Sequence, residues 1–328
     1  MDAIVIGIDG GGTHTRALCA DLAGHILAYT ETGGANPRTN VSAETHVRTA
    51  LSQVLAQAER ESGQVVALVA GFAGLDVLSS AERLSPDQSW AEKFTALPGL
   101  ECPRHHVNDA VVAHAGAFCT EPGVIAIAGS GSTTLGITET GRFVRNRYFR
   151  YYTVASAGSL THHTMIRLLT GEFSAADATF VQRFLEALDV DDIPDLRDKA
   201  GDYTGRKQEE IVHLYGSAAP LVTDAAQMGI PLAMAVCDDA ISSLATGIRL
   251  VGGEFEKESV PYALIGSVAR SAYIINGIEK ALALKRDKRF YMLGPTLPPV
   301  AGAVLLALQK LDVTADDELI ERLRDCPI

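Results

Sequence analysis

A chain of 328 residues is long enough for two domains or one large one, and its 47% of hydrophobic residues supply an ample core. The formal net charge of −12 argues against nucleic acid or an anionic membrane as the main partner. The five cysteines are scattered without a Cys-x-x-Cys pair, which argues against zinc, an iron–sulfur centre and a disulfide framework. The first residues lack the basic-then-apolar pattern of a signal peptide, so we expect a soluble, cytoplasmic protein.

The first thirty residues predict three strands, with a glycine-rich turn between the first two. Residues 3–8 form an apolar run typical of a buried strand, and Asp9 and the glycines at 10–12 follow it directly. Residues 17–21 and 25–30 predict the second and third strands. We therefore expect the glycines to join two antiparallel strands.

The chemistry of this turn suits a phosphate, although a hairpin without a ligand fits the same residues. Glycines let successive backbone N–H groups point at an anion. Thr13 and Thr15 add hydroxyl donors, and Asp9 can hold a hydrated Mg²⁺ beside a phosphate. No Gly-Lys-Ser/Thr follows, which excludes a Walker loop, and the strand after the glycines excludes a dinucleotide fingerprint.

Between residues 31 and 118, helices and strands alternate. A loop with two glycines and a proline, at 31–38, leads to an amphipathic helix that begins after Ser42 and ends before Gly63. The next expected elements are a buried strand, a surface helix, a short strand and a helix, at 65–70, 80–95, 104–107 and 110–118.

After Pro122-Gly123 the opening pattern recurs. A strand at 124–128 leads into a second turn of glycines and hydroxyls at 129–133, and strands follow at 134–138 and near Phe143. We interpret this as an internal pseudo-repeat. The rest of the chain is mainly helical and ends in an acidic segment. Helices are expected at 160–170, 175–189, 206–216, 217–228, 231–251, 269–283 and 300–311, strands at 262–265 and 290–293, and the acidic segment at 315–324.

Three positions carry candidate chemistry, each beside a structural alternative. Two glycine turns on two repeated units suggest a phosphate held between two domains. Asn108 and Asp109 lie where a strand meets a helix, so they fit either a helix cap or a general base for a hydroxyl that attacks a phosphate. The turn at Gly266-Ser267 fits either a surface for an adenine ring or a tight strand-to-helix connection.

Taken together, these motifs resemble the BadF/BadG/BcrA/BcrD ATPase and N-acetylglucosamine kinase family, part of the actin–hexokinase–heat-shock-chaperone superfamily. The motifs are DGGGTHT at 9–15, GFAG at 71–74, NDAVVAHAGA at 108–117, IAGSGST at 127–133, LIGSVA at 264–269 and PTLPPVAGAVLLAL at 295–308. The resemblance implies an α/β protein of the two-domain actin-like ATPase (ribonuclease H-like) fold, each domain a mixed five-stranded sheet flanked by helices. We place the domains at 1–119 and 120–328, with nucleotide and acceptor bound in the cleft between them.

The resemblance also implies roles for single residues. Asp9 resembles the Mg²⁺-organising aspartate of the family, and Asp109 resembles the catalytic base of its sugar kinases. Asn36 and Asn108 resemble sugar-contacting asparagines, and Ser156 stands at a further substrate position. The residues that resemble the phosphate loops and the adenosine turn are Gly11, Gly12, Thr13, Gly129, Ser130, Gly131, Ser132, Gly266 and Ser267. The implied ligands are ATP, Mg²⁺ and a small sugar or sugar derivative, and the family suggests a homodimer.

The chain departs from the family's sugar kinases after the second glycine turn. Those kinases resemble one another in a Gly-Trp-Gly…Gly-Asp-Glu-Gly-Ser-Gly stretch, whose two carboxylates bind the sugar. Here residues 145–164 read RNRYFRYYTVASAGSLTHHT, and Ser156 and Ala157 stand at the carboxylate positions. Three interpretations are open: an acidic or phosphorylated acceptor met by an arginine, an ATPase or sensor that lost sugar recognition, or a basic surface strand aligned out of register.

The sequence therefore favours an ATP-dependent kinase that phosphorylates a hydroxyl of a small sugar, foremost an amino sugar such as N-acetylglucosamine or glucosamine. The alternative is a BadF/BadG-type ATPase or an ATP- or sugar-binding regulator with altered or lost kinase activity. An ATPase that energises a redox partner is disfavoured, because the related activators need paired cysteines for a bridging iron–sulfur cluster.

Overall fold

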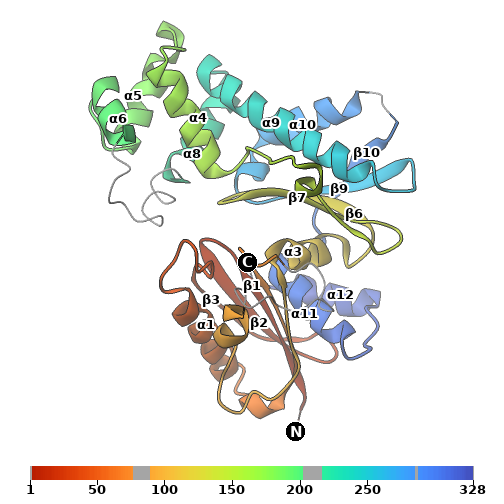
Figure 1. Cartoon of the computed structure of the whole chain (residues 1–328). Helices are drawn as coiled ribbons and strands as arrows, with labels where there is room; N and C mark the ends of the chain where they lie inside the picture. The colour runs from red at the N-terminus through yellow and green to blue at the C-terminus, as the bar shows by residue number, and fades with distance from the viewer. Residues whose placement is uncertain (1, 77–88, 202–215, 285–286, 328) are drawn as a thin grey trace. The chain divides into compact units, whose positions relative to one another are not determined.

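The computed structural model describes residues 2–76, 89–201, 216–284 and 287–327 (Figure 1). By its internal contacts the chain forms two compact units. Unit 1 comprises Met1–Gly123, Glu139–Phe143 and Gly294–Ile328, and unit 2 comprises Val124–Thr138 and Val144–Leu293. Most of the helix expected over 80–95, and all but one residue of that expected over 206–216, lie outside the described residues.

Unit 1 is built on a mixed five-stranded sheet with the strand order β3-β2-β1-β4-β5. Its strands are β1 (Ile4–Gly10), β2 (His14–Asp21), β3 (Ile26–Gly33), β4 (Val65–Phe72) and β5 (Arg104–Asn108). β1 and β2 pair antiparallel, as do β2 and β3, whereas β4 runs parallel to both β1 and β5. The expected glycine turn between two antiparallel strands is therefore confirmed.

Alternating residues of β1 face different helices, because successive side chains of a strand point to opposite faces of the sheet. Ile4, Ile6 and Ile8 are fully buried in the cluster that contains the apolar face of α1 (Ala43–Gln57). On the other face, a Cβ atom at Gly7 would lie 2.5 Å from the backbone nitrogen of Val304 in α11 (Pro299–Gln309). Glycine at this position lets α11 lie directly on the central strand.

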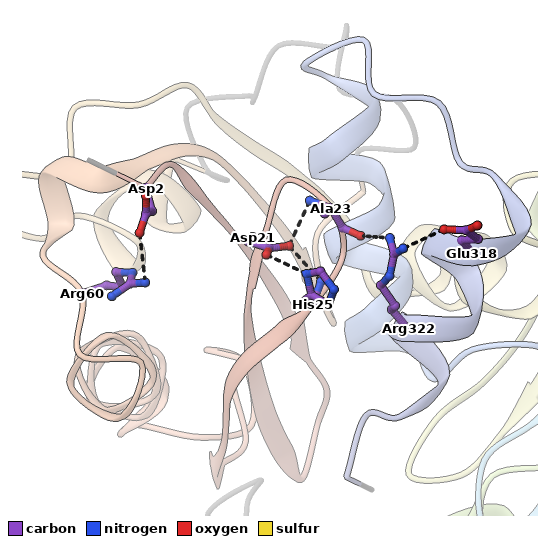
Figure 2. A network of polar contacts seen from close by, with 7 residues as sticks. All are labelled: Asp2, Asp21, Ala23, His25, Arg60, Glu318 and Arg322. Carbon is purple, nitrogen blue, oxygen red and sulfur yellow. Dashed lines mark hydrogen bonds and ion pairs between the residues drawn. The ribbon is translucent and has the colours of Figure 1, made fainter.

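The C-terminal segment packs in unit 1, although the sequence analysis assigns it to the second domain. α11 lies against β1 and against α3 (Asp109–Phe118), and a Cβ atom at Gly302 would lie 2.3 Å from both Gly116 N and Val112 O. α12 (Asp317–Arg324) follows, and Arg322 donates to the backbone oxygen of Ala23 at 2.8 Å and pairs with Glu318 at 2.8 Å (Figure 2). A short helix, α2 (Trp90–Phe94), completes the described helices of this unit.

Unit 2 repeats the sheet plan of unit 1. Its strand order is β10-β9-β6-β7-β8. Counted from β8, three strands that are consecutive in sequence (β8, β7, β6) are followed by two later strands (β9, β10). Unit 1 has the same plan, with β3, β2 and β1 followed by β4 and β5. The strands are β6 (Gly123–Ala128), β7 (Ser132–Ile137), β8 (Phe143–Arg145), β9 (Ser259–Ile265) and β10 (Arg289–Met292). β9 runs parallel to β6 and to β10. The same order in both sheets confirms the pseudo-repeat at the level of topology, although few residues match.

The helices that the structure describes in unit 2 form one large hydrophobic core with its sheet. They are α4 (Ala157–Leu169), α5 (Ala178–Ala187), α6 (Ile193–Gly201), α8 (Ala219–Gln227), α9 (Pro231–Gly252) and α10 (Ala272–Ala283). Helix α6 is not predicted from the sequence, because it is short and Leu196 is the one buried residue among those of its side chains that the structure describes, so its apolar periodicity is weak. In the described residues no single helix is long and apolar enough to cross a bilayer; α8 and α9 reach that length only as a pair bent by 105°.

Candidate functional site

The first glycine turn, residues 10–13, is a tight connection held under the loop that follows β3. Gly11 N donates to His14 O at 2.8 Å, and Ala35 N donates to Gly11 O at 3.0 Å. A Cβ atom at Gly34 would lie only 2.2 Å from the backbone oxygen of Gly12. The turn is thus packed backbone against backbone, which fixes its shape without any side chain.

Asp9 lies buried at the base of this turn, and its carboxyl group is electrostatically unusual. Burial raises its pKa to about 7, and the negative charges of Asp109 and Glu31 act in the same direction. Arg16 opposes the shift, but its Nη1 lies 3.7 Å from Asp9 Oδ2, while its Nε is committed to Glu31 at 2.8 Å. The nearest cation therefore compensates Asp9 only in part.

Asn108 and Asp109 begin α3, and capping falls mainly to Asn108. Asn108 Oδ1 accepts from Ala110 N at 3.1 Å, and its Nδ2 donates to Leu75 O at 2.6 Å. Asp109 Oδ1 also accepts from Ala110 N at 3.0 Å, and the carboxylate stands in the first turn of the helix, where the helix dipole stabilises its ionised form. Asp109 is held by a rigid element at the end of β5, as a catalytic base requires.

Asn36 belongs to the same edge of the sheet. Its Oδ1 accepts from Arg38 N at 3.0 Å, and a Cβ atom at Gly74, where φ is +86°, would lie 2.9 Å from that oxygen. The loop after β4 also receives the Asn108 amide at Leu75 and donates from Ala73 N to Gly10 O at 2.8 Å. Of the predicted residues of unit 1, the structure thus places Asp9, Asn36, Asn108, Asp109 and the first glycine turn around the loop after β4, beside the carboxyl ends of the parallel strands.

The second glycine turn, residues 129–132, is anchored differently. Gly129 N donates to Gly131 O at 2.9 Å, and Ala157 N at the start of α4 donates to Gly129 O at 2.7 Å. Ser132 Oγ donates to Thr153 O at 2.6 Å and accepts from Thr153 Oγ1 at 3.2 Å and from Ala155 N at 3.4 Å. The Ser132 hydroxyl, a predicted phosphate contact, is therefore engaged in holding residues 153–155 against the turn.

The Gly266 turn contacts the second glycine turn through the backbone. Gly266 has φ +106°, and a Cβ atom there would lie 2.4 Å from Ala128 O, so both its conformation and its surroundings require glycine. From the other side, a Cβ atom at Gly129 would lie 3.5 Å from Gly266 Cα. The predicted phosphate and adenosine turns of unit 2 are thus adjacent at the carboxyl ends of β6 and β9.

Residues 145–157, where the family pattern breaks, pack onto the second glycine turn. Asn146 is buried, and its Oδ1 accepts from Thr133 Oγ1 at 3.2 Å and Thr134 N at 3.3 Å. Its Nδ2 donates to Tyr151 O at 2.9 Å. Ser156, a predicted substrate residue, caps α4 by accepting from Ser159 N at 3.1 Å. Sequence reasoning missed Asn146, because nothing local distinguishes a buried bridging asparagine from an exposed one.

The described residues contain no group of three or more His, Cys, Asp and Glu side chains suited to a metal ion. Asp9 and Asp109 form a pair of carboxylates instead. A buried carboxylate of raised pKa beside a second one indicates negative charge that a divalent cation would neutralise, so these residues fit a phosphate-bound Mg²⁺ held by few protein ligands.

A model of the BadF/BadG/BcrA/BcrD ATPase family matches residues 6–307, nearly the whole chain. The chain belongs to this family. A curated relative, the N-acetylmuramic acid/N-acetylglucosamine kinase of Clostridium acetobutylicum, is 31% identical over 146 residues, which cover 43% of this chain and 45% of the relative. The match thus spans less than half the length of that kinase.

Solved structures confirm the actin-like fold of this BadF/BadG family member. A proposed N-acetylglucosamine kinase from Chromobacterium violaceum superposes with a TM-score of 0.70 at 23% identity, covering 94% of this chain and 99% of the other. A ROK-family glucokinase from Streptomyces griseus, solved with glucose and AMPPNP, gives a TM-score of 0.59 at 18% identity, covering 93% and 98%. At these identities the likeness establishes the fold, and the two mixed five-stranded sheets agree with it.

Proposed function

We propose that this protein is an ATP-dependent kinase that phosphorylates a hydroxyl group of a small sugar, with an amino sugar such as N-acetylglucosamine or glucosamine as the first candidate. The observation that carries the proposal is the pair Asp9 and Asp109 beside the first glycine turn. One buried carboxylate of raised pKa and one carboxylate on a helix N-terminus give two distinct environments, as a cation-organising group and a general base require. The partial match to a sugar kinase supports the same reading.

Each group has a defined task in this proposal. The two glycine turns, residues 11–13 and 129–132, bind the phosphates of ATP, and the turn at Gly266 and Ser267 accommodates the adenosine. Asp9 would hold Mg²⁺ beside the first turn, where the ion would supply positive charge to offset that of the transferred phosphoryl group. Asp109 accepts the proton of the acceptor hydroxyl as that oxygen attacks the γ-phosphorus, the bond from this phosphorus to the β–γ bridging oxygen breaks, and ADP leaves with that oxygen. Asn36, Asn108 and Ser156 contact or frame the acceptor.

A second function is favoured by one observation. Ser156 and Ala157 begin α4 where the family's sugar kinases carry carboxylates, and α4 has no acidic residue in its first turn. An ATPase or a nucleotide-binding regulator without sugar transfer is consistent with that loss. Both functions use the same phosphate turns, so they differ only in whether an acceptor accelerates ATP consumption.

The test is an ATP-consumption screen over amino sugars, sugar acids and neutral hexoses, with the wild type, Asp109→Asn and the exposed control Asp198→Asn. We expect at least one acceptor to raise turnover well above basal hydrolysis, and this increase to disappear in Asp109→Asn but not in Asp198→Asn. If no acceptor raises turnover, the kinase proposal fails and the ATPase or regulator reading replaces it. If Asp109→Asn keeps full activity, the assignment of the base is incorrect.

A further inference from the structure

Residues 145–157, where the family pattern breaks, lie in an unusually basic part of an acidic chain. Residues 140–171 contain five arginines and no aspartate or glutamate, whereas the whole chain has a net charge of −12. Arg167 pairs with Glu172 and Asp239, whose oxygens lie 2.8 Å and 3.0 Å from it. Arg145 is buried. Arg142, Arg147 and Arg150 are exposed, and the last two stand on the turn formed by residues 146–151, called here the arginine turn.

The arginine turn is fixed at both ends. Asn146 bonds through its side chain to Thr133, Thr134 and the backbone oxygen of Tyr151. Within the turn, Arg150 N donates to Arg147 O at 2.9 Å and Tyr151 N donates to Asn146 O at 3.3 Å. Arg147 and Arg150 are therefore carried by a hydrogen-bonded turn. Through Asn146 this turn is attached to Thr133 and Thr134, at and just after the end of the second glycine turn.

The far end of the arginine turn is anchored as well. Tyr151 Oη donates to Ser243 O in α9 at 3.2 Å, and Val154 N donates to Ser243 Oγ at 2.9 Å. Beyond it, residues 153–155 are held by Ser132. This framework leaves the rings of two tyrosines on the surface of the segment, Tyr148 at 61% exposure and Tyr152 at 65%, together with the less exposed Phe149. Phenol rings of this kind can pack against a sugar and hydrogen-bond to its hydroxyls.

We propose that the arginine turn selects an acceptor that bears an oxyanion substituent, a carboxylate or a phosphate, and that Arg150 and Arg147 bind this group. The inference rests on the proposed kinase function and names its substrate class. Guanidinium groups bind carboxylate and phosphate through paired N–H donors. The residues at the start of α4, Ser156 and Ala157, carry no charge that would repel such a group. A carboxylate pair at those positions would instead favour a neutral sugar.

The test measures binding and turnover separately, on the full chain. Calorimetric titrations use N-acetylmuramic acid as the carboxylate probe, glucosamine 6-phosphate as the phosphate probe and N-acetylglucosamine as the neutral probe. We expect at least one anionic probe to bind at least about tenfold more tightly than the neutral one, with a preference that shrinks as salt is added. The stronger of the two anionic probes identifies the substituent.

Three variants test whether the arginine turn is responsible for the preference for an anionic probe. Arg150→Gln and Arg147→Gln should each reduce the affinity for the preferred anionic probe about tenfold and leave that for N-acetylglucosamine unchanged. Arg150→Gly removes the charge at a position where φ is +52°, which glycine adopts freely, so loss of folding would not explain its effect. Arg183→Gln, on the exposed face of α5, removes one positive charge elsewhere in the same unit and serves as the matched control.

The outcomes separate this inference from the proposed function. Anion-selective binding that depends on Arg150, without phosphoryl transfer, supports the inference and overturns the kinase. Turnover of neutral sugars, with no preference for an anionic probe, supports the kinase and overturns the inference. Equal affinities for all probes, no binding of any probe, or equal losses for neutral and anionic probes in Arg150→Gln would each overturn the inference.

Discussion

The two glycine turns follow corresponding strands of two sheets with the same strand order, yet their surroundings differ in charge. The first turn lies among carboxylates, with Asp9 buried below it and Asp109 and Glu31 close enough to raise the pKa of Asp9. The second turn lies among hydroxyl groups, with Ser132 and Thr153 bonded to each other beside it. The glycine turn is common to both units, but the side chains around it differ: the first turn has carboxylates beside it, and the second has hydroxyl groups that bond to each other and to the backbone.

The turns also differ in what holds them. The first is fixed by backbone packing, in which Gly34 leaves no room for a side chain against Gly12. The second is fixed by backbone contact with Gly266 and by the Ser132 hydroxyl, which ties it to residues 153–155. A change near the first turn should therefore act mainly through charge, whereas a change near the second should act mainly through structure.

The largest effect is expected from Asp109→Asn. If Asp109 is the general base, kcat with the best acceptor should fall by about 10²–10⁴-fold, because proton transfer in the transition state is lost. Folding stability should change little, since an asparagine oxygen can still accept from Ala110 N. Steady-state kinetics and urea denaturation of the same preparations check both points, and a fall in activity that tracks unfolding would contradict the assignment.

The charge of Asp9 should make the stability of the metal-free protein depend on pH. Its folded pKa is about 7, above the value of 3.8 expected without the fold, so the folded state binds a proton more tightly. This contribution to stability is fully present below about pH 4 and is lost as pH rises through about 7, a change on the order of 4 kcal/mol.

Asp9→Asn should remove that dependence. Urea denaturation in EDTA, from pH 4 to pH 8, should show wild-type stability falling relative to the variant as pH rises. Addition of Mg²⁺ with ATP at pH 8 should stabilise the wild type, because a ligand that binds only the folded state raises its stability. Parallel pH profiles of the two proteins would show that Asp9 is not protonated in this range.

Gly266→Ala tests the backbone contact of the second turn. A side chain at φ +106°, with its Cβ atom 2.4 Å from Ala128 O, should destabilise unit 2 by about 1–3 kcal/mol. Gly131→Ala is the matched control, since no atom lies within 4 Å of its Cβ position, and it should cost less than about 1 kcal/mol. Thermal or urea unfolding of the two variants distinguishes them, and similar losses in both would refute the proposed packing.

Ser132→Ala should have the smallest effect, and on stability more than on nucleotide affinity. The variant loses a donor to Thr153 O and an acceptor for Ala155 N, which together should cost about 1 kcal/mol. The Michaelis constant for ATP should stay within about a factor of three. A large rise in that constant with unchanged stability would instead favour a direct contact between the Ser132 hydroxyl and a phosphate.

Local patterns in the sequence determined most of the secondary structure and the two glycine turns. The apolar run at 3–8, Asp9 and the following glycines predict a strand and a tight turn wherever they occur, because sterics and side-chain alternation act between near neighbours. The same holds for the strand before Gly129 and for the cap at Asn108. The fold class also followed from the sequence, since its motifs are spread over nearly the whole chain.

Only the tertiary structure decided the chemistry within these turns. The pKa of Asp9 depends on Asp109, which lies a hundred residues further along the chain, and on burial that no local pattern reports. The sequence predicts that the Ser132 hydroxyl donates to a phosphate, but in the folded protein this hydroxyl donates to the backbone oxygen of Thr153. Likewise, α11 packs on β1 because Gly7 leaves room for it, and against α3 because Gly302 does the same there. The charge around a side chain, its burial and its hydrogen bonds all depend on its neighbours in space. They are therefore determined only when segments that are distant in the sequence come together.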